Sequence, residues 1–172
     1  MKSMTHRVAL VRLVAFATEL TGIASVGSRR AAYVGGTVTA LASATSPVNG
    51  YIQTADESAL VFDADAQPSL DQSIRIPYAN VIDLEYGQKA GRRVSAAIGY
   101  SIVVGPAGLL ALMSKKRHHY LTVGYTTDDG KAQVAVFEVG KDIVRTTLAI
   151  VQARSGKKIA YQDEDARRWE SR

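Results

Sequence analysis

Two neighbouring histidines, His118 and His119, are the first residues of this chain whose type suggests chemistry. Imidazole is a common metal ligand, but adjacent side chains on a strand point to opposite faces, so this pair cannot chelate one ion. The chain contains no cysteine, which excludes thiolate metal sites, disulfides and a thiol nucleophile. We therefore predict no metal site and interpret the pair as polar residues at the start of a strand.

Acidic pairs are the second group of residues that suggests chemistry. Asp128 and Asp129 have the residue type needed for acid–base work or for calcium, but Gly130 follows at once, and Asp-Gly is typical of a tight hairpin turn. No serine stands in a Gly-x-Ser-x-Gly context, and no glycine-rich stretch carries the Lys and Ser/Thr of a phosphate-binding loop. These residues predict no catalytic site, no cofactor and a protein that is not an enzyme.

The most distinctive part of the chain is residues 94–114, an apolar segment of twenty-one residues without a single charge. The stretch from Glu85 to Tyr120 contains six basic residues and one acidic residue, Glu85 itself, so its charge of +5 equals the net charge of the whole chain. Basic residues that bracket an apolar segment favour anionic lipid headgroups. Nucleic acid instead usually meets basic residues spread over one face, so we predict no nucleic-acid partner. The predicted lipid-contacting residues are Arg92, Arg93, Ile98, Tyr100, Val103, Leu109, Leu110, Lys115, Lys116 and Arg117.

A segment of this length can cross a bilayer as one helix. Its centre is Gly-Pro-Ala-Gly at residues 105–108, however, and both flanks are basic, which favours a helical hairpin that enters one leaflet. If the strands before and after the segment share a sheet, both of its ends lie on one side of any membrane and a single crossing is excluded. Each arm of about eleven residues then reaches roughly 16 Å, about half of a hydrocarbon core.

Two other interpretations of the apolar segment stay open. Its small residues, including the Ser95-x-x-x-Gly99 spacing, allow close helix contacts, so the segment is also compatible with a subunit interface or a cover folded back on the domain. A true membrane span requires the shared-sheet prediction to be wrong.

Residues 1–30 form a leader with three open interpretations. Residues 8–20 are mostly apolar, follow a basic start and contain a cleavage-like Ala-Phe-Ala at residues 15–17, as in a secretory signal. Arg12 and Glu19 interrupt the apolar run and instead favour an amphipathic helix that is retained. A disordered leader is the third interpretation.

The rest of the chain alternates between short extended runs and turns, followed by one amphipathic helix over residues 142–155. Asp142 is its predicted N-cap, and Gly156 ends it. Ile82, Leu84 and Tyr86 are predicted to share one strand face. The predicted strands are residues 37–42, 51–54, 59–63, 73–76, 80–86, 120–126 and 132–139.

This order predicts a mainly β fold: a small antiparallel barrel or sandwich closed by a C-terminal helix, with an apolar helical hairpin as an insert. Helices do not alternate with strands, which argues against a parallel doubly wound sheet. The domain is predicted to cover residues 31–159. Residues 160–172 are charged and without pattern, and we expect a mobile tail there.

The element order, the sequence IPYANVIDLEYG and the run HHYLTVGYTTDDGKAQVAVFEVGKD before the final helix together resemble the pleckstrin-homology-like (PH-like) superfold. The bacterial PH-like and GRAM-like versions are the most similar. The resemblance covers roughly residues 31–159 and implies a small barrel capped by a helix. Eukaryotic PH domains that bind inositol lipids carry a basic first hairpin loop, whereas the matching residues 43–50 have no basic residue. The apolar insert is also no part of the plain fold.

These observations predict a non-catalytic, membrane-associated adaptor or scaffold that contacts anionic lipid and recruits an unidentified protein partner. One alternative is a soluble homo-oligomer whose apolar inserts form the subunit interface. Another is a secreted ligand-binding barrel with a cavity lined by several tyrosines. The basic flanks favour the cytoplasmic face of a membrane, whereas a cleaved leader places the domain outside, so the membrane side stays open.

Overall fold

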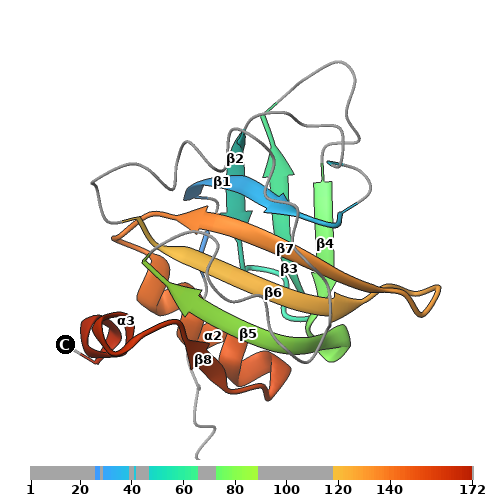
Figure 1. The fold of residues 1–172 in the computed structure, drawn as a ribbon. Helices are drawn as coiled ribbons and strands as arrows, with labels where there is room; N and C mark the ends of the chain where they lie inside the picture. The colour runs from blue at the N-terminus through green and yellow to red at the C-terminus, as the bar shows by residue number, and fades with distance from the viewer. Residues whose placement is uncertain are drawn as a thin grey trace, which may run out of the picture.

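A curled sheet that forms a half-barrel is the main feature of the computed structural model (Figure 1). Within the described residues, eight strands form one sheet in the order β4-β3-β2-β1-β7-β6-β5-β8. The elements are β1 (Arg29–Gly36), β2 (Val48–Gln53), β3 (Ala59–Ala64), β4 (Ser73–Pro77), the 3-10 helix η2 (Tyr78–Asn80), β5 (Val81–Gly87), β6 (Tyr120–Thr126), β7 (Ala132–Val139), α2 (Val144–Ser155), β8 (Ile159–Tyr161) and α3 (Glu164–Glu170). The structure describes residues 26–27, 29–38, 41, 47–65, 73–88 and 118–171.

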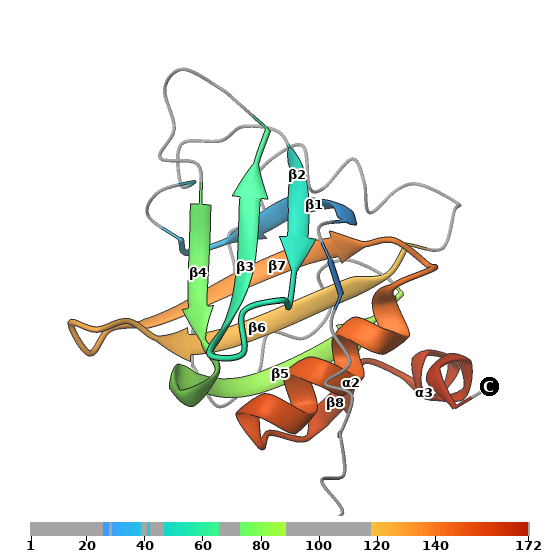
Figure 2. The ribbon, with the colours of Figure 1, turned by 180° about the vertical axis from the view of Figure 1, so that it is seen from behind.

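The first and seventh strands hold the two halves of the sheet together. Strand β1 pairs antiparallel with both β2 and β7, so the meander β1–β4 joins the meander β5–β7 through one shared strand pair. In Figure 1 strands β2–β4 stand across the direction of β5–β7, and Figure 2 shows α2 against the lower edge of the half-barrel. The predicted antiparallel, mainly β architecture with a helix near the C-terminus is confirmed.

The core lies on the concave face of the sheet and under α2. Alternation places Ala135, Phe137 and Val139 of β7 inward, and all three are buried, as the period of two predicts. The Phe62 and Phe137 rings lie 5.3 Å apart, and Leu148 of α2 closes the cluster. The other face of β1, β6 and β7 holds a second, smaller buried cluster formed by Val34, Tyr120, Val134 and Val136.

The predicted first strand over residues 37–42 is wrong. The strand lies earlier, at β1, where Tyr33 faces Phe137 of β7. Gly36 ends it with a φ of 134°, and a Cβ at this position would lie 2.1 Å from the Val134 carbonyl oxygen. Long-range pairing with β7 therefore decides where this strand lies, and the local composition of residues 29–36 does not reveal it.

Ile82 does not share the inward face of Leu84 and Tyr86, which corrects the sequence prediction. The pairing register between β5 and β6 shifts between Val81 and Asp83, as in a β-bulge. Val81 is therefore buried in place of Ile82, whose exposed fraction is 37%.

Helix α2 ends where the sequence predicts but begins differently. Gly156 adopts a left-handed conformation with a φ of 69°, and its N–H donates to the Gln152 carbonyl. At the other end Ile143 is the N-cap and no side chain caps the helix, so the prediction of Asp142 is wrong. The backbone N–H groups of Ile143 and Val144 instead donate to the Gly140 carbonyl.

Regular structure follows α2 where we expected a patternless tail. Strand β8 pairs in parallel with β5, with Ile159 opposite Leu84. Asp163 then caps α3, because its carboxylate accepts a 2.9 Å hydrogen bond from the Ala166 N–H. Ala166 itself is fully buried, so α3 packs on the domain.

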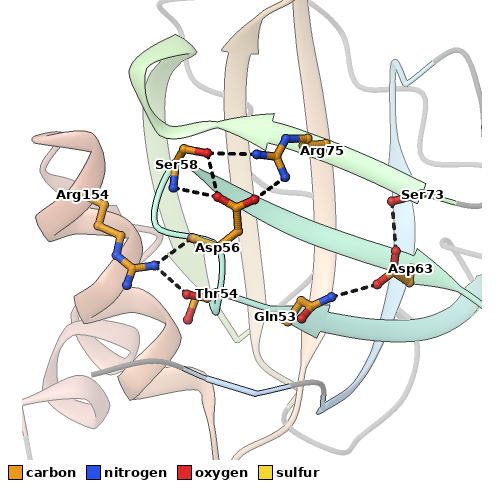
Figure 3. Close-up of polar contacts among 8 residues, drawn as sticks. All are labelled: Gln53, Thr54, Asp56, Ser58, Asp63, Ser73, Arg75 and Arg154. Atoms are coloured by element: carbon orange, nitrogen blue, oxygen red, sulfur yellow. Dashed lines mark hydrogen bonds and ion pairs between the residues drawn. The ribbon is translucent and has the colours of Figure 1, made fainter. Parts of the chain in front are cut away.

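A polar network fastens the far end of α2 to the β2–β3 turn (Figure 3). The Arg154 guanidinium donates to the carbonyl oxygens of Thr54 and Asp56, at 2.5 and 3.0 Å. The Asp56 carboxylate accepts from Arg75 of β4 and from Ser58, and these bonds hold the pKa of Asp56 well below its usual range. One arginine therefore satisfies two turn carbonyls that face the helix.

Replacing Arg154 by Gln is expected to lower the free energy of unfolding by about 2 kcal/mol, because bonds from a charged donor to two carbonyls are lost. Urea unfolding followed by circular dichroism measures this. Lys157→Gln is the matched control, since Lys157 is an exposed cation near the same helix end. Equal losses in both variants would mean that charge at the helix terminus, and not the carbonyl contacts, stabilises this region.

Candidate functional site

The predicted lipid-contacting residues, from Arg92 to Arg117, lie outside the described residues, as do residues 1–25 and 28 of the predicted leader over residues 1–30. The structure does describe the two points where the chain enters and leaves residues 89–117. These points and the side chains around them define the candidate site.

Both points lie at the same end of one strand pair. Strands β5 and β6 are antiparallel neighbours, with Tyr86 opposite Leu121 and Gly87 opposite Tyr120. This confirms the premise that the strands flanking the apolar segment share a sheet. Gln88 and His118, the described residues on either side of residues 89–117, therefore lie next to each other at the same end of this strand pair.

The two histidines at this edge point to opposite faces, as predicted. His118 Nδ1 lies 2.6 Å from the Glu138 carboxylate of β7. His119 is 5% exposed, and its Nδ1 lies 2.6 Å from the Tyr86 hydroxyl of β5. Each histidine has its own partner, so they do not form a joint metal site; within the described residues no group of three potential ligands is close enough to hold an ion.

His119 belongs to a cluster that joins the sheet to the C-terminal helix. The His119 cluster is defined here as Tyr86, His119, Arg145, Tyr161 and Trp169. The indole of Trp169 lies 4.2 Å from the His119 ring and 5.9 Å from the Tyr86 ring, measured between centroids. Tyr161 meets Tyr86 edge-on and bonds to Glu170 of α3. Aromatic contacts thus connect β5, β6, β8 and α3 at the base of the apolar segment.

Arg145 holds Trp169 from α2. Its guanidinium carbon lies 4.5 Å from the indole centroid, and its Nη2 donates a 2.6 Å hydrogen bond to the Trp169 carbonyl oxygen. A cation over an indole face and a charge-assisted bond to the same residue act together. Trp169 is therefore held between the imidazole of His119 and the cation of Arg145.

Burial sets the protonation state of this cluster. Burial raises the pKa of Tyr86 to about 12, so its hydroxyl keeps its proton. Burial, followed by the positive charge of Lys141, lowers the pKa of His119 below its usual range. The imidazole is therefore neutral at pH 7, and the four rings of the cluster form an uncharged aromatic contact beside the Arg145 cation.

A cavity of about 430 Å³ lies at the opposite end of β5 and β6, between β4, η2 and the β6–β7 hairpin. Its described lining is mixed in polarity and includes Arg75, Asn80, Tyr125, Asp128 and Gln133. Tyr125 is the single tyrosine of this lining, and its hydroxyl donates to Gln133 at 2.8 Å. These residues do not form the cavity lined by several tyrosines that the ligand-binding barrel requires.

The acidic pair Asp128-Asp129 has the predicted turn role. Gly130 has a φ of 80°, and its N–H donates to the Thr127 carbonyl. Asp129 bonds to Thr127 and pairs with Lys131 at 2.6 Å, while Asp128 accepts from Asn80 at 3.5 Å. All of these contacts are exposed and lie at the hairpin, so both carboxylates serve to shape the turn.

Trp169 and Tyr86 were not predicted as a functional pair, although one signal for α3 was present. Asp163 precedes two acidic residues and is followed by Arg167 and Arg168, the charge order of a short capped helix. The contact with His119 joins residues fifty positions apart, and no local pattern encodes it.

Comparison with family models and with curated proteins finds no match to this chain. Among the described helices, none has the length and apolar character that a bilayer crossing requires.

Replacing Arg145 by Gln is expected to shift the emission of Trp169 to longer wavelength at neutral pH, because the indole loses its cation and its carbonyl bond. Trp169 is the only tryptophan, so its fluorescence reports this site alone. Arg167→Gln is the matched control, since the Arg167 side chain is 67% exposed on α3, the helix that carries Trp169. Identical spectra for Arg145→Gln and the native protein would contradict the conclusion that Arg145 holds Trp169 in place.

Proposed function

We propose that this chain is a non-catalytic, PH-like adaptor that attaches to a membrane through residues 94–114 and their basic flanks. The observation that carries the proposal is the pairing of Gly87 with Tyr120. An uncharged segment of twenty-one residues has both of its attachment points at one edge of the domain. That arrangement supports entry into one leaflet and return to the same side, with the half-barrel outside the bilayer.

The PH-like part of the proposal is supported by topology. In the order β4-β3-β2-β1-β7-β6-β5, two antiparallel meanders meet at the β1–β7 pair, and α2 follows the last of the seven strands. This is the element order that the sequence resemblance implies. The parallel strand β8 and helix α3 are additions to that plan, and α3 contacts the strand pair that carries the apolar segment.

Charge and apolar area favour anionic membranes as the binding surface. Each buried Leu, Ile or Val side chain contributes about 2 kcal/mol, and each basic residue near an anionic surface adds about 1 kcal/mol. Several residues of each kind lie within residues 89–117. Within the described part of the chain β4 is an edge strand and α2 has an exposed face, and these are the surfaces we propose for a protein partner.

Replacing Ile98, Val103, Leu109 and Leu110 together by Ser is expected to abolish flotation of the full-length protein with vesicles that contain anionic lipid. The loss amounts to about 8 kcal/mol of apolar transfer free energy at about 2 kcal/mol per side chain. The matched control exchanges the same four positions among Leu, Ile and Val, which keeps apolar character.

Unchanged flotation of the serine variant would contradict membrane entry. A native protein that forms a discrete oligomer and ignores vesicles, together with a serine variant that becomes monomeric, would instead identify a subunit interface.

Replacing Lys115, Lys116 and Arg117 by Gln is expected to weaken binding to anionic vesicles about 100-fold, since three basic residues contribute about 3 kcal/mol. The residual binding should depend less steeply on salt, because Lys89, Arg92 and Arg93 remain on the other flank. Lys157 and Lys158 form the control pair, because they follow the C-terminal end of α2. The candidate site around His119 lies near the other end of this helix. Vesicle co-sedimentation across a salt series measures both. An equal loss in the control pair would mean that overall charge, and not the flank, directs binding.

A further inference from the structure

We propose that the His119 cluster is a pH-sensitive contact, in which neutral His119 keeps α3 bound to the sheet and protonated His119 releases it. This inference does not depend on the membrane proposal, because it rests on contacts within the domain. It assigns a regulatory role to α3, the last helix of the described chain.

The geometry makes a proton at His119 costly. The ring is 5% exposed and lies between the Tyr86 hydroxyl, at 2.6 Å, and the Trp169 indole, at 4.2 Å. A buried charge without a partner is strongly disfavoured. A protonated imidazole donates from both nitrogens, so the Tyr86 hydroxyl can then act only as the acceptor of this bond.

The surrounding charges add to this cost. Lys141 before α2 and Arg145 on α2 are cations near the ring, and the His118 side chain is next to His119 in the chain. Glu138 of β7 is the nearby carboxylate, but it is already bonded to His118 at 2.6 Å. On α3, Glu170 is bonded to Tyr161. A protonated His119 therefore shares the indole with the Arg145 cation and has no free carboxylate among these groups.

The direction of the pH effect follows from linkage. When α3 is released, the His119 imidazole regains its ordinary pKa of about 6.5. While α3 is bound, burial and the Lys141 charge keep the pKa of His119 lower. Binding of α3 is therefore strongest above pH 6.5, and it weakens as the pH falls through the interval between these two values. Within that interval the ratio of bound to released α3 falls by up to tenfold per pH unit.

Release has a defined structural consequence. Trp169 leaves the cluster, and Tyr86 and Tyr161 lose their cover. These rings lie beside Gly87, where the chain enters residues 89–117. Acidification thus exposes an aromatic surface at the base of the apolar segment while the rest of the half-barrel stays folded.

Fluorescence of the single tryptophan tests the proposal in the full-length protein held in a mild non-ionic detergent. Between about pH 7.5 and about pH 5, the range in which histidine titrates, the native emission is expected to shift to longer wavelength and to become more accessible to acrylamide. His119→Asn keeps a side-chain acceptor but does not titrate, so its emission should not change with pH. His118→Asn is the matched control and should retain the native transition.

Three outcomes would overturn the proposal. One is a shift that persists in His119→Asn, since another group would then titrate. Another is a loss of intensity without a shift, because a protonated imidazole can quench an indole that stays in place. The third is a parallel loss of the far-ultraviolet circular dichroism of the sheet, which would mean global unfolding.

A reciprocal measurement does not depend on the His119→Asn variant being well folded. If release of α3 and protonation of His119 are coupled, Trp169→Ala must raise the pKa of His119 toward its ordinary value. Nuclear magnetic resonance of the imidazole in the native protein and in Trp169→Ala measures this directly. The same titration midpoint in both proteins would contradict the coupling.

Discussion

The antiparallel register between β5 and β6 is the constraint on which the rest of the structure depends. It pairs Gly87 with Tyr120 and so brings together two points that are thirty-three positions apart in the chain. The register itself is set by alternation, because Leu84, Leu121 and Val123 must all enter the core. A slip of one residue would move these side chains to the outer face, so the attachment points of the apolar segment are held as firmly as the core.

Helix α2 uses an arginine at each end to fasten a different part of the fold. Arg145 in the first turn holds Trp169 of α3, and Arg154 in the last turn binds the carbonyls of the β2–β3 turn. Both contacts join elements that are far apart in sequence. The Arg154 contact lies on a network of charged and polar groups, whereas the Arg145 contact lies on an aromatic cluster with a titratable ring. If protonated His119 releases α3 as proposed above, the two ends of α2 differ in how they respond to acid.

Local patterns predicted the parts of the fold that local physics decides. The extents of β6 and β7, the turn at Asp128-Asp129-Gly130 and the end of α2 at Gly156 are each specified within a few residues, and each was predicted correctly. Long-range packing decided the rest. Strand β1 is a strand because of β7, about a hundred residues later, and Ile82 faces outward because β5 contains a bulge.

The candidate site shows the same division. The apolar segment and its charges are plain in the sequence, and the shared sheet that brings its ends together was expected from the strand pattern. The His119 cluster was not, because Trp169 lies beside His119 and Tyr86 only through the pairing of β8 with β5, which places α3 there. Helix α3 is seven residues long and depends on that contact, so propensity alone does not predict it.

The central claim is that residues 94–114 enter one leaflet and return to the side from which they came. Measuring the depth of individual positions of the segment in the bilayer tests it most directly. Because the chain has no native cysteine, a single introduced cysteine can be labelled at each position. Single cysteines at positions 94, 106 and 114 can each carry a fluorophore in vesicles made with lipids brominated at different depths. We expect the label at position 106 to lie deepest and the labels at 94 and 114 both to lie at the headgroups of the same leaflet. A depth that changes steadily from 94 to 114, or no quenching by lipid at any position, would contradict it.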